Sequence, residues 1–328
     1  MMKKLILIFA AMILLSGLCA CGADNVMAQD NGKLNIVTTI FPEYDWIRNI
    51  LGEESEHAEL TMLVDSGVDL HSYQPSAEDI LRISTCDVFV YIGGESDSWV
   101  KDALKESANK DMVVVNLMES LGDAVKEEEL VEGMQGEEEE EEECEEEEGP
   151  EYDEHIWLSV KNAELSCKVL SEALKKADPD HAAEYESNTA AYIEKLDALD
   201  TKYEEAVAQG STHTLLFADR FPFRYMTDDY GLDYYAAFIG CSAETEASFE
   251  TIMFLAQKVD EQKLDNVMII ESGDGRIAQT VIDNTEAKNA KILKLNSIQS
   301  VTAKDVQAGA AYLSIMEENL EVLKEALK

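Results

Sequence analysis

The chain has 328 residues, with 26 Lys and Arg against 68 Asp and Glu, so its formal net charge is −42. A chain this negative excludes nucleic acid as a partner, because phosphate binding requires clustered Lys and Arg. Hydrophobic residues make up 46% of the sequence, which excludes wholesale disorder. The length of the chain is enough for two cores of about 150 residues each. The composition also excludes collagen, coiled-coil arrays and multispan membrane proteins.

The first twenty residues have the pattern of an export signal. Two lysines precede the apolar run Leu5–Leu15, which is too short to span a bilayer comfortably. The sequence LCAC, which ends at Cys21, resembles a bacterial lipoprotein box. We therefore expect a signal peptide over residues 1–20, acylation of the Cys21 thiol, and a polar tether over residues 21–33. The mature chain would then be exported and anchored in the lipid bilayer, on the extracytoplasmic face of the cell membrane. An ordinary secretory signal is the alternative.

The rest of the chain alternates β-rich runs with helical patterns, which predicts an α/β fold with parallel sheets covered by helices. The runs form two series of four, so we expect two similar lobes over residues 34–177 and 211–328. The strands are expected at Leu34–Thr39, Ala58–Val64, Asp87–Ile92, Met112–Leu117, His213–Ala218, Leu232–Ile239, Asn266–Glu271 and Lys291–Leu295. Helices are expected at Pro42–Leu51, Ser76–Ile83, Ser98–Ser107, Phe221–Tyr230, Ser248–Gln262, Arg276–Asn284 and, closing the chain, Ala303–Leu327.

A long helix is predicted between the two series. Asp178 can cap its start and Pro179 can be its first helical residue. Apolar residues from Tyr185 to Val207 then recur at steps of four and three, which is one face of a helix, and Gly210 ends the pattern. The helix is expected over residues 178–210. A helix of about 30 residues is roughly 45 Å long, enough to join both lobes as a rigid strut.

Residues 123–154 contain 19 acidic side chains and one Lys. Self-repulsion and a lack of apolar residues predict a disordered surface loop inserted in the first lobe. The loop is either a solvated spacer or a flap that collects cations weakly, with Cys144 as a soft ligand.

Four cysteines remain after Cys21, and none has CxxC spacing. Export permits disulfides, but the sequence cannot choose among the three possible pairings. Three of the four lie in apolar or small-residue surroundings, so we interpret them as buried free thiols. They are Cys86, Cys167 and Cys241, and the fourth cysteine is Cys144.

Two histidines stand where a binding cleft is expected. Ligands of open α/β sheets bind beyond the carboxyl ends of the strands, and His71 follows the strand predicted at Ala58–Val64. His155 follows the acidic segment, in the sequence DEHIWLS. The strand that ends near Glu271 can add that carboxylate or Asp274 to the same cleft. Two imidazoles and a carboxylate suit a first-row divalent ion. We interpret the other histidines as ordinary: His57, His181 and His213.

These segments resemble the metal-binding components of bacterial zinc and manganese ABC transporters. The resemblance is carried by the lipoprotein box, the His71 segment through Tyr73 and Pro75, DEHIWLS, the Glu271–Arg276 turn and the long helix. It covers most of residues 34–328. It implies two lobes joined by a helix, with the metal held between them in the interlobe cleft. It also implies delivery to a membrane permease and its ATPase, and we expect a monomer.

By resemblance, His71 and His155 match the first two metal ligands of the family and Asp274 matches the last. The third ligand is absent, because Ala218 occupies its position and cannot coordinate a metal. A neighbouring carboxylate or a water molecule would have to replace it. The weaker candidate ligands are Asp219, Glu244, Glu246 and Glu271.

The leading hypothesis is a lipid-anchored receptor that captures Zn²⁺ for an ABC importer. Manganese is the alternative metal, because one missing imidazole leaves a harder ligand set, while the charged loop favours zinc by resemblance. An exported zinc metallohydrolase is a second class, since two His, one Asp and a water describe a catalytic site. Against it, no general base is evident outside the ligand set, and there is no HExxH or GxSxG motif. A cell-adhesion protein or a cation buffer is the third class.

Overall fold

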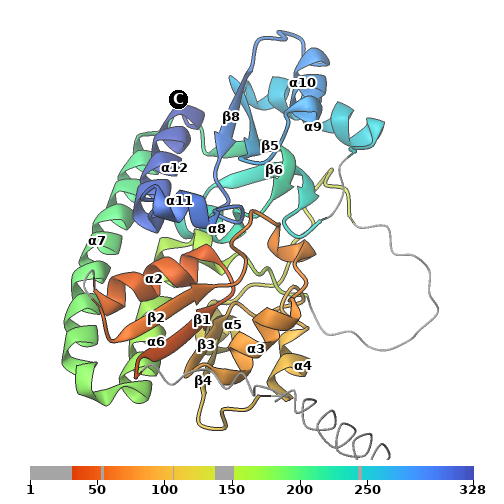
Figure 1. Cartoon of the computed structure of the whole chain (residues 1–328). Helices are drawn as coiled ribbons and strands as arrows, with labels where there is room; N and C mark the ends of the chain where they lie inside the picture. The colour runs from red at the N-terminus through yellow and green to blue at the C-terminus, as the bar shows by residue number, and fades with distance from the viewer. Residues whose placement is uncertain (1–31, 53–54, 106, 137–150, 243–245) are drawn as a thin grey trace, which may run out of the picture. The chain divides into compact units, whose positions relative to one another are not determined.

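Two four-stranded parallel sheets form the centre of the computed structural model (Figure 1). Their strand orders, β2-β1-β3-β4 and β6-β5-β7-β8, are equivalent, as expected for two similar lobes. All eight predicted strands are confirmed, with small shifts at their ends. They are β1 (Leu34–Thr38), β2 (Ala58–Met62), β3 (Val88–Tyr91), β4 (Val113–Asn116), β5 (Thr214–Phe221), β6 (Asp233–Ile239), β7 (Asn266–Ile270) and β8 (Lys291–Leu295).

The structure describes residues 32–52, 55–105, 107–136, 151–242 and 246–328. The predicted signal peptide, Cys21, Cys144 and Glu244 lie outside these ranges. Within them, no helix combines the length and apolar character needed to cross a bilayer.

Helices cover the two sheets. They are α2 (Phe41–Leu51), α3 (Ala77–Thr85), α4 (Val100–Lys105), α5 (Leu117–Leu121), α6 (Val160–Ala177), α7 (Ala182–Gln209), α8 (Arg224–Tyr230), α9 (Phe249–Gln262), α10 (Arg276–Asp283), α11 (Ala303–Gln307) and α12 (Tyr312–Ala326). Short 3₁₀ turns are η1 (Leu70–Ser72), η2 (Gly122–Ala124), η3 (Ile156–Leu158) and η4 (Pro179–His181). The single closing helix that we predicted is wrong. Gly309, at φ +98°, and the extended Ala311 divide it into α11 and α12.

The long linking helix is confirmed as α7, with 28 residues and a length of about 42 Å. Its start differs from the prediction, because Asp178 and Pro179 open η4 and α7 begins only at Ala182. The helix runs along both lobes. It packs against α2 and α6 of the first lobe and against α12 of the second (Figure 1). Its predicted apolar face is buried, with Tyr185 and Tyr203 fully inaccessible.

Buried hydrogen bonds join the two lobes close to His155. The indole Nε1 of Trp157 donates to the carbonyl of Ser297 at 2.9 Å, and the Tyr312 hydroxyl donates to the carbonyl of Trp157 at 2.7 Å. The backbone N–H of Tyr312 donates to Asp45 at 2.9 Å. The segment that carries His155 is therefore attached to both lobes.

The expectation of disorder throughout residues 123–154 is wrong for the described flanks of this segment. The backbone of Glu128 pairs with that of Glu151, and Gln135 donates to the carbonyl of Ala237 in the second lobe at 2.9 Å. Met134 is buried in the core, so scattered apolar residues fix the flanks despite their charge. The Glu-rich centre, residues 137–150, lies outside the described residues.

Asp97 is a buried carboxyl group in the loop that follows β3. Its Oδ2 accepts a hydrogen bond from Gly93 at 3.0 Å, whereas Oδ1 has no partner among the described residues. Burial raises the pKa of Asp97 to about 7. The ordinary value is 3.8, so the folded chain binds this proton over a range in which the unfolded chain releases it.

We therefore expect Asp97 to make the free energy of unfolding fall as the pH rises from about 4 to about 7. Asp97→Asn cannot ionise, so its stability should depend less on pH across this window. Denaturant unfolding of both chains at a series of pH values measures the difference. Asp123→Asn, at an exposed position, is the control. Identical pH slopes for Asp97→Asn and the parent chain would contradict the prediction.

Candidate metal centre

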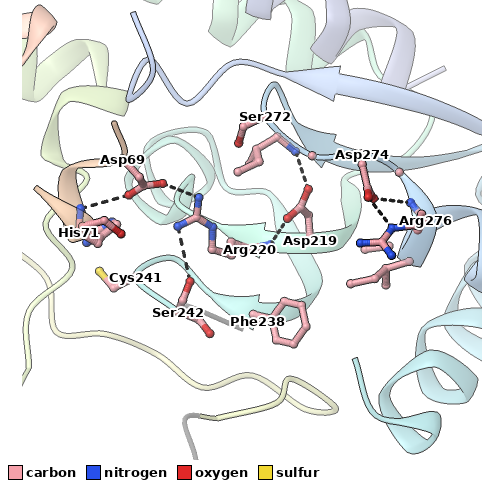
Figure 2. A pocket seen from close by; sticks show the side chains of 16 residues that line it. Asp69, His71, Asp219, Arg220, Phe238, Cys241, Ser242, Ser272, Asp274 and Arg276 are labelled. Carbon is pink, nitrogen blue, oxygen red and sulfur yellow. Dashed lines mark hydrogen bonds and ion pairs between the residues drawn. The ribbon is translucent and has the colours of Figure 1, made fainter. Parts of the chain in front are cut away.

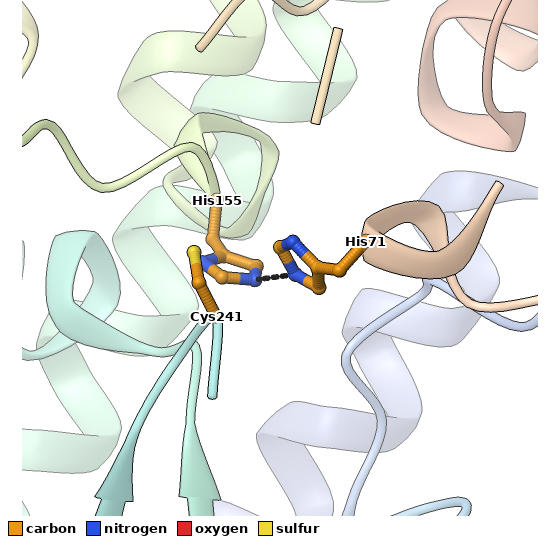
Figure 3. Close-up of side chains that lie close together, drawn as sticks. All are labelled: His71, His155 and Cys241. Atoms are coloured by element: carbon orange, nitrogen blue, oxygen red, sulfur yellow. Dashed lines mark hydrogen bonds between the residues drawn. The ribbon is translucent and has the colours of Figure 1, made fainter. Parts of the chain in front are cut away.

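His71 and His155 face each other across a short gap. Their Nε2 atoms are 3.3 Å apart, and Cys241 lies beside them (Figure 3). One donor atom from each of the three residues lies within 4.8 Å of the others. Zinc–nitrogen bonds of 2.0–2.1 Å in a tetrahedron place two donors about 3.3 Å apart. The imidazole pair therefore already has the spacing that one tetrahedral ion requires, and the thiol of Cys241 supplies a third donor.

His71 is positioned by its neighbours in η1 and in the loop after β3. Asp69 caps η1 by accepting a hydrogen bond from the backbone of His71 at 3.1 Å. The ring Nδ1 of His71 bonds the hydroxyl of Ser96 at 2.7 Å, which turns Nε2 toward His155. Burial, followed by the charge of His155, lowers the pKa of His71 to about 4. The ring is therefore neutral at pH 7 and can donate its lone pair to a metal.

His155 is fully buried and held by Asp153. The carboxylate accepts from the backbone N–H of His155 at 2.8 Å and from its ring Nδ1 at 2.9 Å. Because a carboxylate only accepts, Nδ1 carries the proton and the lone pair lies on Nε2, the atom that faces His71. Gly240 packs against this ring, and a Cβ at position 240 would lie 2.8 Å from Cε1 of His155.

The residue next to His155 ties the centre to the loop after β3. Glu154 is buried, and its Oε1 accepts a hydrogen bond from the backbone of Ser96 at 2.8 Å. Gly94 has φ +78°, and a Cβ there would lie 2.4 Å from Oε1 of Glu154. Both the left-handed backbone and the close contact require glycine at this position.

Cys241 follows the carboxyl end of β6. Three cysteines lie among the described residues, and all are free thiols, as the sequence predicted; Cys86 and Cys167 are buried and Cys241 is partly buried. Burial, followed by the charge of Glu128, raises the pKa of the Cys241 thiol well above its ordinary value. A metal that binds there must displace the thiol proton. Sequence reasoning missed this candidate ligand, although its place beyond a strand end is the signal that selected His71.

Asp274 does not belong to the cluster. Its carboxylate accepts a hydrogen bond from the backbone N–H of Arg276 at 2.9 Å and forms an ion pair with the guanidinium group of the same residue. Figure 2 shows His71 and Cys241 at one end of a cavity of about 480 Å³ and Asp274 with Arg276 at the other end. The sequence placed Asp274 correctly on the cleft wall, but local pairing with Arg276 holds it away from the two imidazoles.

The weaker candidate ligands either form hydrogen bonds to other groups or lie exposed on the surface. Asp219 accepts from the backbone N–H groups of Arg220 at 2.9 Å and Ile270 at 3.3 Å. Glu271 accepts from Ser297 and Ser300. Glu246 is exposed. None of the three contributes an atom to the cluster of His71, His155 and Cys241.

An ion pair crosses the cavity beside the cluster. Arg220 of β5 bonds Asp69 of the first lobe at 2.7 Å (Figure 2). Burial alone raises the pKa of Asp69, but the hydrogen bond and charge of Arg220 more than offset it and lower the pKa. The register of β5 shifts between Phe217 and Arg220, and Ala218 within this irregularity lines the cavity without offering a donor.

Removal of the Asp153 carboxylate should weaken metal binding. In Asp153→Ala the ring of His155 loses the acceptor that fixes its proton on Nδ1, and loss of such a partner typically costs 10–100-fold in metal affinity. Asp153→Asn keeps an acceptor oxygen and should lose less. Competition with a chromophoric zinc chelator measures the affinity. Asp111→Asn, on an exposed turn, is the control. Parent-like zinc affinity in Asp153→Ala would refute this role for the carboxylate.

Comparison with known proteins places this centre in context. The family described as zinc-uptake complex component A, periplasmic (ZnuA), matches residues 36–326. The zinc-binding lipoprotein AdcA of Streptococcus pneumoniae is 32% identical over 324 residues, which are 99% of this chain and 61% of that protein. The high-affinity zinc uptake system protein ZnuA of Bacillus subtilis is 29% identical and is covered over 96% of its length. The chain thus spans about three fifths of the length of the streptococcal relatives.

Solved structures agree with these matches. The crystal structure of the Zn(II)-bound ZnuA-like domain of Streptococcus pneumoniae AdcA is similar to this chain with a TM-score of 0.70 and 30% identity. The similarity covers 90% of this chain and 99% of that domain. The two-lobed fold with a linking helix is therefore the fold of these metal-binding proteins.

Proposed function

The chain belongs to the ZnuA family of zinc-uptake components, and from this premise we propose that it is an extracytoplasmic receptor that captures Zn²⁺ for an ABC importer. The observation that carries the proposal is the 3.3 Å separation of the two Nε2 atoms of His71 and His155, beside a free thiol. In this proposal the protein binds and hands over the ion and performs no catalysis. Its partners are the permease and the ATPase of the importer.

His71, His155 and Cys241 are the proposed zinc ligands. Two imidazoles and a thiolate form a nitrogen and sulfur set that suits Zn²⁺, whereas Mn²⁺ favours oxygen donors. Cys241 thus supplies in space the third donor that is missing at Ala218. The fourth position is open to water or to a carboxylate. Among the acids that line the adjoining cavities, we propose two candidates: Glu128, which lines the cavity beside Cys241, and Asp274, which would have to leave Arg276 and move from the far end of the larger cavity.

The attachment of the receptor rests on the sequence. We propose that the exported chain is a monomer anchored by lipid on Cys21, with residues 22–33 as a tether. The Glu-rich segment 137–148 is proposed as an accessory that raises the local concentration of cations without forming the specific site.

Cys241→Ser is expected to lower zinc affinity by about a hundredfold or more, because zinc loses its thiolate ligand. Calorimetric titration of the detergent-solubilised chain with Zn²⁺, in buffers of different ionisation enthalpy, also counts released protons. The parent chain should release about one proton per zinc ion from the thiol, and Cys241→Ser should release none. Cys86→Ser, at a buried free thiol outside the cluster, is the matched control and should behave as the parent chain.

Two further outcomes bear on the proposal. Asp274→Asn and Glu128→Gln identify the fourth ligand, because only the variant that removes a ligand weakens the tight site. Tighter binding of Mn²⁺ than of Zn²⁺ would reassign the cargo to manganese. Weak sites alone, which disappear when residues 137–148 are deleted, would overturn the cleft receptor and leave a cation buffer.

A further inference from the structure

A second group of metal-binding side chains lies at the junction of α6 and α7. It consists of His57, Asp178 and His181, whose donor atoms all lie within 4.8 Å of one another. His57 directly precedes β2, Asp178 ends α6, and His181 ends η4 just before α7. The sequence alone led us to interpret both histidines as ordinary, and more than a hundred residues separate them.

The three side chains already converge on one carboxylate oxygen. Oδ2 of Asp178 accepts from Nδ1 of His181 at 2.7 Å and lies 3.9 Å from Nε2 of His57. The two imidazole rings are stacked with their centres 3.7 Å apart and nearly parallel. This arrangement leaves the side chains 17–37% exposed, so an ion from solvent can reach them.

A buried tyrosine holds the carboxylate in place. The hydroxyl of Tyr185 donates to Oδ2 of Asp178 at 2.7 Å, and its oxygen contacts Nε2 of His57 at 2.9 Å. Because the hydroxyl proton points to the carboxylate, the ring of His57 must donate to the tyrosine oxygen. The two ring nitrogens nearest the carboxylate therefore carry protons in the metal-free state, and each ring can shift that proton to its other nitrogen.

We propose that His57, Asp178 and His181 form a second binding site for Zn²⁺, distinct from the cluster of His71, His155 and Cys241. Two imidazoles and one carboxylate, with water in the remaining position, are an accepted zinc ligand set. Donors in a zinc tetrahedron lie about 3.3 Å apart. Nδ1 of His181, now 2.7 Å from Oδ2 of Asp178, must therefore move away, Nε2 of His57, now 3.9 Å from it, must approach, and the two rings must give up their stacking. Binding there is therefore weaker than in the cleft. A bound ion would fasten the start of β2 to the start of α7.

Histidine-ring NMR can test this site without interference from the acidic segment. The chain has five histidines, so His71→Gln with His155→Gln leaves only the two site histidines and His213. His213 is exposed and outside both clusters, and it serves as an internal control. With ¹⁵N-labelled rings in the detergent-solubilised chain, the expected result is that Zn²⁺ shifts His57 and His181 together while His213 stays unchanged.

Asp178→Asn, added to the same chain, should lower the zinc affinity that these shifts report at least tenfold, because the anionic ligand is lost. His57→Gln should remove the response of His181, and circular dichroism confirms that each variant is folded. Equal shifts at all three histidines, no shift at His57, or an unchanged response in Asp178→Asn would each overturn the second site. These outcomes do not depend on the cleft, which is already disabled in this chain.

Discussion

Every strand pairing within the two sheets is parallel, and the rest of the structure depends on this constraint. Parallel strands end at the same edge of a sheet, so the loops that follow them gather there. The loop after β2 carries His71, the loop after β3 carries Ser96, and the turn after β6 carries Cys241. Residues far apart in sequence thus become neighbours without any contact between the strands that carry them.

The cluster also depends on how the two lobes are joined. His71 comes from the first lobe and Cys241 from the second. His155 belongs to a segment of the first lobe that is bonded to Ser96 of the same lobe through Glu154 and to Ser297 and Tyr312 of the second lobe through Trp157. The ion pair of Arg220 with Asp69 adds a direct bond between the lobes next to His71. The two imidazoles are therefore held by contacts within the first lobe, and the placement of the second lobe decides whether Cys241 reaches them.

The sequence predicts the strands well because each is a short apolar run bounded by polar residues. It also predicts that His71 and His155 share a cleft, since both stand beyond structured segments in specific contexts, and the two rings do lie side by side. It does not single out Cys241, because a cysteine between small residues looks the same in the sequence whether it is packed in the core or lies at a cleft. For Asp274 the sequence does not reveal the competing interaction with Arg276, two residues away, which holds this carboxylate at the far end of the cavity. The ordered flanks of the acidic segment depend on a few apolar contacts, and a prediction from net charge alone does not take these contacts into account.

The close packing of Gly240 on His155 and of Gly94 on Glu154 bears on which substitutions the proposed site can tolerate. Any substitution of glycine adds a side chain. At both positions the first atom of that side chain would lie too close to a neighbouring side chain. In our proposal one donor takes the place of another, since Cys241 supplies the donor missing at Ala218, whereas a side chain at Gly240 or Gly94 would have to displace His155 or Glu154. Exchange of one donor type for another can therefore leave the backbone around the site in place, while a side chain at either glycine cannot. Residues that bind no ion thus constrain the site as well as the residues proposed to bind it.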